Sequence, residues 1–267
     1  MGNKIIGIMP YYARLPHFVN EVLKGSIESY FLYAFESMQK YCDFVVVSVA
    51  RREDLDWLLE KKLSRFQPLF YSNVDEVLLS SAMTASVQQD FIRNSDIPFD
   101  YIMYSDPWNI LYFEQDIKKY TDIIDKDKNI YLTPNIIESA PVSRIDDVIR
   151  KNKELGRSDF FRWDLAKVQR KNTLFYLSRN KDNISENYYN DEVYECKSLG
   201  TAYSGSYLCH KELFEKVKIT FNPENFHYHS GGWDIYKNKN SVPVRTIKKW
   251  GFYCDNLSSW DYNAYSL

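Results

Sequence analysis

An acidic residue directly after an apolar run is the clearest candidate for chemistry in this sequence. Residues 99–105 read Phe-Asp-Tyr-Ile-Met-Tyr-Ser, and Asp106, Pro107, Trp108 and Asn109 follow them. Hard cations such as Mg²⁺ and Mn²⁺ take oxygen ligands, so Asp106 and the amide oxygen of Asn109 suit either ion. Such an ion can bridge the two phosphates of a nucleotide donor. The plainer interpretation is that Asp106 only forms a turn, where Asp is common.

Aromatic and basic residues follow two other apolar runs. Pro10, Tyr11 and Tyr12 come after the first run, and Arg51 comes after the second. Either tyrosine can stack on the base of a donor, because aromatic stacking tolerates any base. Arg51 can hold donor phosphates with two parallel hydrogen bonds. We group these four residues with Ser105 as donor-binding candidates, although a tyrosine-rich turn and a solvated helix start would look the same.

Small and acidic residues form two further candidates later in the chain. Ser204 and Gly205 can contact acceptor hydroxyl groups, or they can simply permit close packing of a strand. Gly232 allows close approach of the backbone to a bulky sugar, and Trp233 can stack on a sugar ring. Asp234 follows them, and as a general base it would deprotonate an acceptor hydroxyl. The alternative for this segment is a tight turn that Asp234 caps.

The candidates in the first half follow elements that alternate between strand and helix. This pattern implies right-handed crossovers and a mainly parallel sheet with helices on both faces. In such sheets the ligand binds beyond the carboxyl ends of the strands, where Asp106 and Arg51 are expected. The predicted strands are residues 4–9, 43–49, 68–71 and 99–105, and the predicted helices are residues 21–41, 51–62 and 74–93.

The second half of the chain has a looser pattern. It predicts strands at 128–133 and 201–209, helices at 143–171 and 210–217, and a polar loop at 178–198. No internal repeat or linker is evident in the sequence, so we expect both halves to share one sheet.

Composition excludes several classes of protein. The formal net charge is −2, which argues against broad binding of nucleic acid. The chain contains neither a G-x-G-x-x-G motif nor a G-x-x-x-x-G-K-[ST] motif, which disfavours a dinucleotide site and a P-loop kinase. The four cysteines show no C-x-x-C spacing. The N-terminal apolar run is too short for a signal peptide or a transmembrane segment, so we expect a cytoplasmic protein.

Three segments, in this order, resemble the GT-A glycosyltransferases. The run that ends in Asp106 is similar to the strand that carries their D-x-D metal motif. Residues 203–214, Tyr-Ser-Gly-Ser-Tyr-Leu-Cys-His-Lys-Glu-Leu-Phe, are similar to an element on their acceptor side. The segment Gly-Gly-Trp-Asp that ends at Asp234 is similar to one whose acid is the base in inverting members. The sequence departs from the family at the second Asp of D-x-D, where it has Trp108.

The resemblance implies a single α/β domain over residues 1–267, with the GT-A (Rossmann-like) fold. Residues 1–113 would bind the nucleotide sugar and residues 114–267 the acceptor. The implied enzyme moves a sugar from a nucleotide-diphosphate sugar to a hydroxyl of a glycan or a lipid-linked acceptor, with inversion. Asp106 would organise the diphosphate through Mn²⁺ or Mg²⁺, and Asp234 would be the base.

Two other functions remain open at this point. The missing second acid of the D-x-D motif is compatible with a degenerate glycosyltransferase-like domain that binds glycans or partners without catalysis. A sugar nucleotidyltransferase also uses a parallel sheet and a metal ion. Enzymes of that class typically have a glycine-rich loop with basic residues after the first strand. No such loop follows Met9 in this sequence.

Overall fold

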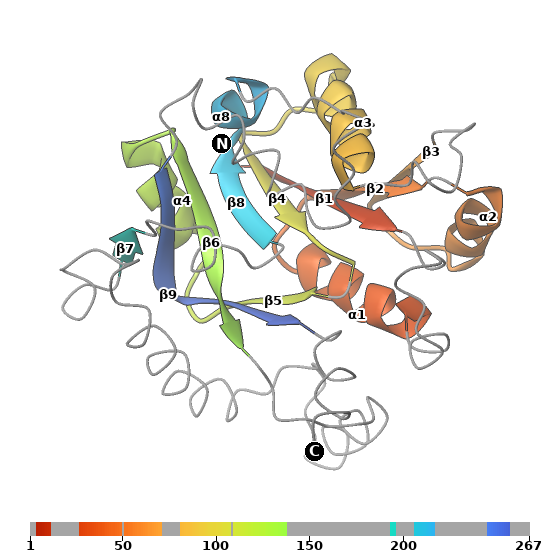
Figure 1. The fold of residues 1–267 in the computed structure, drawn as a ribbon, viewed down its shortest axis with the longest axis horizontal. Helices are drawn as coiled ribbons and strands as arrows, with labels where there is room; N and C mark the ends of the chain where they lie inside the picture. Colours follow the sequence, from red (N-terminus) through yellow and green to blue (C-terminus); the bar gives the residue numbers. More distant parts are fainter. Residues whose placement is uncertain are drawn as a thin grey trace, which may run out of the picture.

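The computed structural model describes residues 4–11, 27–49, 51–70, 81–107, 109–137, 193–195, 206–216 and 245–256 (Figure 1). The strands are β1 (Ile5–Tyr11), β2 (Phe44–Val49), β3 (Phe66–Phe70), β4 (Tyr101–Ser105), β5 (Asn109–Phe113), β6 (Ile130–Ile137), β7 (Val193–Glu195), β8 (Ser206–His210) and β9 (Arg245–Asn256). The helices are α1 (Ile27–Gln39), α2 (Arg52–Glu60), α3 (Ser81–Asn94), α4 (Lys118–Lys126) and α8 (Lys211–Lys216).

The strands of this described part form one nine-stranded sheet. Its order is β3-β2-β1-β4-β8-β6-β9-β5, with β7 paired to β9. The first four strands in this order are parallel neighbours. Strands β1 and β4 are buried along their whole length, which explains why both read as continuous apolar runs. The predicted α/β architecture with a mainly parallel sheet is confirmed.

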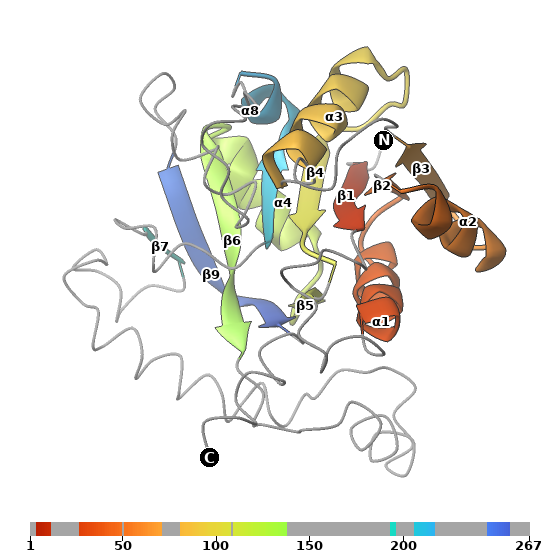
Figure 2. The ribbon, with the colours of Figure 1, turned by 45° about the vertical axis from the view of Figure 1, so that its right-hand side comes forward.

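Helices cover both faces of the sheet, because successive strand residues point to opposite sides. The odd-numbered residues of β1 and β2 belong to a core that includes α1, α2 and α4, whereas the even-numbered ones pack with α3 and α8. Figure 2 shows β1 between α1 and α3. Gly7 lets α1 approach β1 closely, because a Cβ atom there would lie 2.5 Å from Sδ of Met38.

The second half of the chain completes the sheet. Strand β8 inserts between β4 and β6 and runs antiparallel to both. Strand β9 first runs parallel to β6, and its later residues pair antiparallel with β5. The register of the β6–β9 pair shifts between Thr133 and Asn135, and Gly251 of β9 has a φ of 93° near this irregularity. The strands β5 and β9 and the helix α4 are elements that the sequence analysis missed.

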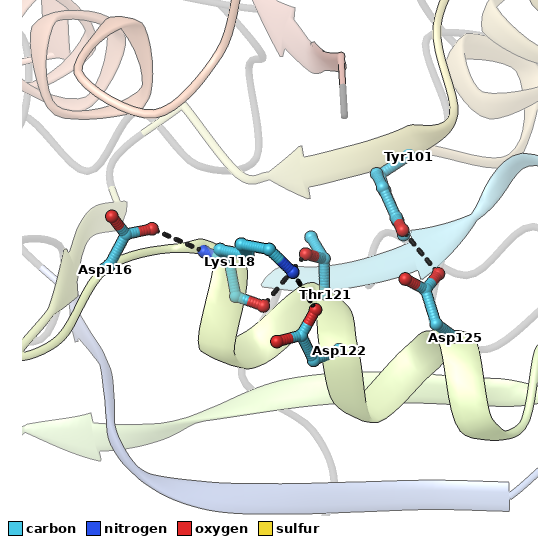
Figure 3. Close-up of polar contacts among 6 residues, drawn as sticks. All are labelled: Tyr101, Asp116, Lys118, Thr121, Asp122 and Asp125. Carbon is cyan, nitrogen blue, oxygen red and sulfur yellow. Dashed lines mark hydrogen bonds and ion pairs between the residues drawn. The ribbon is translucent and has the colours of Figure 1, made fainter. Parts of the chain in front are cut away.

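Helix α4 is held against the sheet by polar contacts at the amino end of β4 (Figure 3). The hydroxyl of Tyr101, the first residue of β4, donates a hydrogen bond to the carboxylate of Asp125. Within the helix, the ammonium of Lys118 pairs with Asp122, and the backbone N–H of Lys118 bonds to the Asp116 side chain at 2.8 Å. This anchor lies at the opposite end of β4 from Asp106.

Several predictions of the sequence analysis fall outside the described residues. The helix expected at 143–171 is one of them, and so is most of the loop expected at 178–198. Residues 193–195 of that loop are a strand, so the loop prediction is wrong there: their backbone pairs with β9. Among the helices that the structure describes, none has the length and apolar character needed to cross a membrane.

Candidate functional site

Asp106 lies where the sequence analysis expected it, directly after β4 and at the carboxyl end of the parallel strands. Strands β1 and β4 pair with Ile8 opposite Tyr104, and Pro10 and Asp106 come two residues further along each strand. Strand β2 ends at the same edge, with Ser48 opposite Pro10. The structure therefore brings the ends of β1, β2 and β4 together at one edge of the sheet.

The carboxyl group of Asp106 is nearly buried and carries no counter-charge from the described residues. Its side chain is 7% exposed. The hydroxyl of Tyr104 donates a hydrogen bond of 3.0 Å to Oδ1 of Asp106, and no described Lys or Arg forms an ion pair with it. Burial raises the pKa of Asp106 from 3.8 to about 7, while the bond from Tyr104 lowers the pKa in part. Asp106 is thus an acid whose charge is poorly compensated.

A buried polar network lies behind the turn that begins at Asp106. Its members are Ser105, Asn109 and Ser206, which are at most 2% exposed. The hydroxyls of Ser105 and Ser206 are 3.0 Å apart, and Nδ2 of Asn109 lies 3.1 Å from Oγ of Ser206. The backbone N–H of Asn109 donates to the carbonyl of Asp106 at 3.1 Å. These contacts tie the turn to β8.

Three tyrosines line the face of the sheet beside Asp106. The rings of Tyr104 and Tyr207 are stacked with centroids 5.0 Å apart, and Tyr131 meets Tyr207 edge to face at 5.0 Å. Burial raises the pKa of the Tyr207 phenol, and the negative charge of Asp106 raises it further. These rings form a stiff apolar support for the acid.

The other donor-binding candidates in the described part differ in their surroundings. Pro10 is buried within β1. Tyr11 is a core residue that is 1% exposed, and its ring stacks on Trp57 with centroids 5.2 Å apart. In this structure the Tyr11 side chain therefore serves to pack the core between β1 and α2. Arg51 is partly exposed and stands directly before α2, at the edge that carries Asp106.

Six candidate residues fall outside the described part of the chain. They are Tyr12, Ser204, Gly205, Gly232, Trp233 and Asp234. The expected base and the expected acceptor side are therefore predictions from the sequence only.

Sequence reasoning missed the residues that support Asp106. Tyr104 precedes Asp106 by two positions, so the alternation of a strand could have placed both on one face. Tyr207 and Ser206 could not have been found in this way, because they reach the site only through the pairing of β4 with β8.

The residues at this edge fit a divalent cation that is held mainly by its substrate. Across the stretches with described coordinates, no three His, Cys, Asp or Glu side chains gather as metal ligands. Asn109 is fully buried, and its amide nitrogen, which is not the predicted ligand atom, bonds to Ser206. Mg²⁺ commonly binds through one or two carboxylates together with substrate phosphates. Asp106 alone can supply that single protein ligand.

Comparison with known sequences yields no match to a protein family and no match to a curated protein. Comparison of structures does find neighbours. A crystal structure of GalNAc-T7 with UDP, GalNAc and Mn²⁺ has a TM-score of 0.51 and 10% sequence identity, with 95% of this chain covered. The chain spans 43% of the length of that neighbour. At this identity the similarity shows the fold alone, which is GT-A-like with a mainly parallel sheet flanked by helices.

Other solved structures are less similar. The 4-diphosphocytidyl-2C-methyl-D-erythritolsynthase of Anaerococcus prevotii DSM 20548 has a TM-score of 0.44 and 11% identity, over 92% of this chain and 87% of that one. HddC from Yersinia pseudotuberculosis has a TM-score of 0.31 and 14% identity, over 48% of this chain and 58% of that one.

Proposed function

We propose that this chain is a glycosyltransferase that uses a nucleotide-diphosphate sugar. The observation that carries the proposal is the Asp106 carboxyl group, nearly buried at the carboxyl edge of a GT-A-like sheet and without a cationic partner among the described residues. A desolvated acid of this kind is stabilised by a bound cation, and strongly shifted acids gather at functional sites. The GalNAc-T7 structure of similar fold holds UDP, GalNAc and Mn²⁺, which supports this choice of substrate class.

The donor binds in residues 1–113 in this proposal. Asp106 would be the residue that holds Mn²⁺ or Mg²⁺ beside the diphosphate, Arg51 contacts a phosphate, and Tyr12 contacts the base. The cation supplies electrostatic stabilisation of the leaving diphosphate. Pro10 and Ser105 shape the backbone on either side of the donor.

The acceptor, a glycan or a lipid-linked hydroxyl compound, binds in residues 114–267. Ser204, Gly205, Gly232 and Trp233 contact it. Asp234 accepts the proton of the attacking hydroxyl as the oxygen bonds to the anomeric carbon. The bond between that carbon and the diphosphate oxygen breaks with its electron pair on the diphosphate, so the sugar is transferred in one step with inversion.

A thermal-shift screen tests the donor half of the proposal. UDP-, GDP-, CMP- and dTDP-sugars are each added with Mn²⁺ and, separately, with EDTA. A ligand that binds only the folded protein raises the melting temperature. A rise with one nucleotide that disappears in EDTA and in Asp106→Ala supports the metal site, whereas no rise with any donor contradicts the proposal.

The acceptor half is tested with Asp234→Asn. Loss of turnover with unchanged binding of the donor supports a general base. Weaker binding of the donor with unchanged turnover contradicts it. The configuration of the product, measured by NMR at the anomeric carbon, decides whether transfer inverts.

A non-catalytic glycan- or partner-binding domain is the second candidate. Trp108, which stands where the D-x-D motif has its second acid, favours it. Slow hydrolysis of the bound donor in the absence of acceptor would separate the two, since only an enzyme cleaves the sugar–phosphate bond.

A further inference from the structure

Behind Asp106 lies a chain of hydrogen bonds that joins Asn109, Ser206 and Ser105. Nδ2 of Asn109 donates to Oγ of Ser206 at 3.1 Å. The hydroxyl of Ser206 also lies 3.0 Å from Oγ of Ser105, and either of the two can be the donor. Ser105 can also direct its single proton to a backbone carbonyl of the turn, with that of Asp106 at 3.3 Å and that of Asn109 at 3.4 Å. Each hydroxyl has one proton and two lone pairs, so it can take part in more than one of these contacts.

The buried position of this chain makes it rigid. Ser105 and Asn109 are fully buried, and Ser206 is 2% exposed. An unmade hydrogen bond at such a depth is costly, so the three groups hold one another in place. Ser206 contacts both of the others through its hydroxyl. It also lies 3.9 Å from Sγ of Cys254 on β9.

Ser206 comes from a distant part of the sequence. It stands opposite Ser105 in the β4–β8 pair and is separated from it by 101 residues. Its hydroxyl joins the turn at Asp106 to β8, and the backbone of Asn109 pairs with Asn256 of β9. The carboxyl of Asp106 is held from the other side by Tyr104.

We infer that Ser206 is a positioning residue, which fixes the backbone of the turn through Ser105 and Asn109 and thereby aims the Asp106 carboxylate at the diphosphate of the donor. The inference concerns a residue that does not touch the ligand. The claim that Ser206 affects ligand binding rests on the proposed function, whereas the claim that Ser206 fixes the turn does not.

Ser206→Ala is the main test, and Ser37→Ala is the matched control. Ser37 is a serine of similar burial on α1, which also takes part in two hydrogen bonds, to the carbonyl of Ala34 at 2.8 Å and from the N–H of Leu111 at 3.0 Å. Both substitutions remove a buried hydroxyl that takes part in hydrogen bonds, but only the Ser206 hydroxyl bonds to Ser105 and Asn109. Ser206→Thr keeps the hydroxyl and tests for rescue.

The first measurement is hydrogen exchange of the Asn109 backbone amide, which needs no ligand. Local opening of a segment exposes its amides without global unfolding, so we expect exchange at least about tenfold faster in Ser206→Ala and within about twofold of wild type in Ser37→Ala. Ser105→Ala removes the last link and should act like Ser206→Ala. Equal exchange in all variants, after correction for global stability, overturns the inference.

The second measurement is the affinity for the nucleotide sugar that stabilises the wild type, with Mn²⁺ present. We expect Ser206→Ala to weaken it by at least about fivefold, Ser37→Ala to leave it unchanged and Ser206→Thr to restore most of it. Equal losses in both alanine variants mean that Ser206 is merely structural. If the wild type binds no nucleotide sugar, the proposed function fails, and the exchange of Asn109 still decides whether Ser206 fixes the turn. If Ser206→Ala does not fold, Ser105→Ala decides by both measurements.

Discussion

Replacing Asp106 by asparagine should stabilise the protein at alkaline pH in the absence of metal. The pKa of this carboxyl is about 7 in the folded protein, because burial disfavours its charge. In the unfolded chain the pKa of Asp is about 3.9. The folded protein therefore binds the proton more tightly, and its free energy of unfolding falls as the pH rises from about 4 to about 7.

The size of the effect follows from these two pKa values. A difference of about three pH units corresponds to about 4 kcal/mol at 1.36 kcal/mol per unit, and this full cost is present above about pH 7. Asparagine cannot ionise, and its oxygen can still accept the bond from Tyr104. Between about pH 5 and about pH 8 the advantage of Asp106→Asn over wild type should thus grow by about 2–3 kcal/mol.

Urea unfolding in EDTA at several pH values measures this advantage. The shift in the urea midpoint gives the change in the free energy of unfolding, provided that this free energy depends on urea concentration with the same slope in both proteins. Asp56→Asn is the control, because Asp56 is exposed and forms a surface ion pair with Arg52 at 3.0 Å. Such pairs contribute about 0–1 kcal/mol.

An advantage that does not change with pH would refute the reasoning. It would mean that the Asp106 carboxylate is ionised at no cost in the folded state, and the argument for a cation at this edge would fail with it. A loss of stability at every pH would instead mean that the carboxylate makes contacts that the asparagine cannot replace.

Three further predictions concern the sheet and the acid. Gly7→Ala should cost about 1–3 kcal/mol in a thermal or urea melt, because its methyl group would lie 2.5 Å from Sδ of Met38, and a wild-type midpoint would contradict this packing. Gly251→Ala should cost about 2 kcal/mol, measured in the same way, because of its φ of 93° and a tyrosine hydroxyl 2.6 Å from the new methyl; a cost close to zero would count against the strand irregularity. Tyr104→Phe should shift the pH midpoint of Mn²⁺ binding upward by up to about one unit, since its hydroxyl lowers the pKa of Asp106. Calorimetric titration with Mn²⁺ at several pH values, in the presence of the nucleotide sugar that stabilises the wild type, measures this shift, and an unchanged midpoint would remove Tyr104 from the site.

Much of the first half of the fold could be predicted, because its physics is local. The run at 43–49 is β-branched and apolar, and it is the buried strand β2 (Phe44–Val49). The run before Asp106 is β4, and its end is the edge where the acid lies. In each case burial on both faces of a parallel sheet leaves a continuous apolar signature in the sequence.

The second half lacked such a signature. Strand β9 contains Lys248 and Lys249, which are both buried, and Gly251 interrupts it. A pattern with two lysines and a glycine does not indicate a strand, and only pairing with β5, β6 and β7 forms one. Helix α4 is rich in Lys and Asp, so its few apolar positions were overlooked.

The candidate site divides in the same way. Asp106 could be found because an acid after a buried strand is a local feature. The stacking of Tyr11 on Trp57 could not be predicted, because it depends on how α2 packs against β1. The contact of Ser206 with Ser105 could not be predicted, because it depends on which strand lies next to β4.

The place of β8 in the sheet has a consequence for the order of folding. Strand β4 cannot gain its second neighbour until a loop of roughly 100 residues closes, and long-range pairing of this kind slows folding. The four parallel strands β3, β2, β1 and β4 need no contact from beyond residue 105, so we expect them to collapse first on a growing chain. The turn at Asp106 would then reach its final geometry only after residues 206–210 have emerged and docked. The ligand-binding geometry at this edge would thus form late in folding. A nucleotide that needs this geometry would bind the folded protein and not its partly folded intermediates.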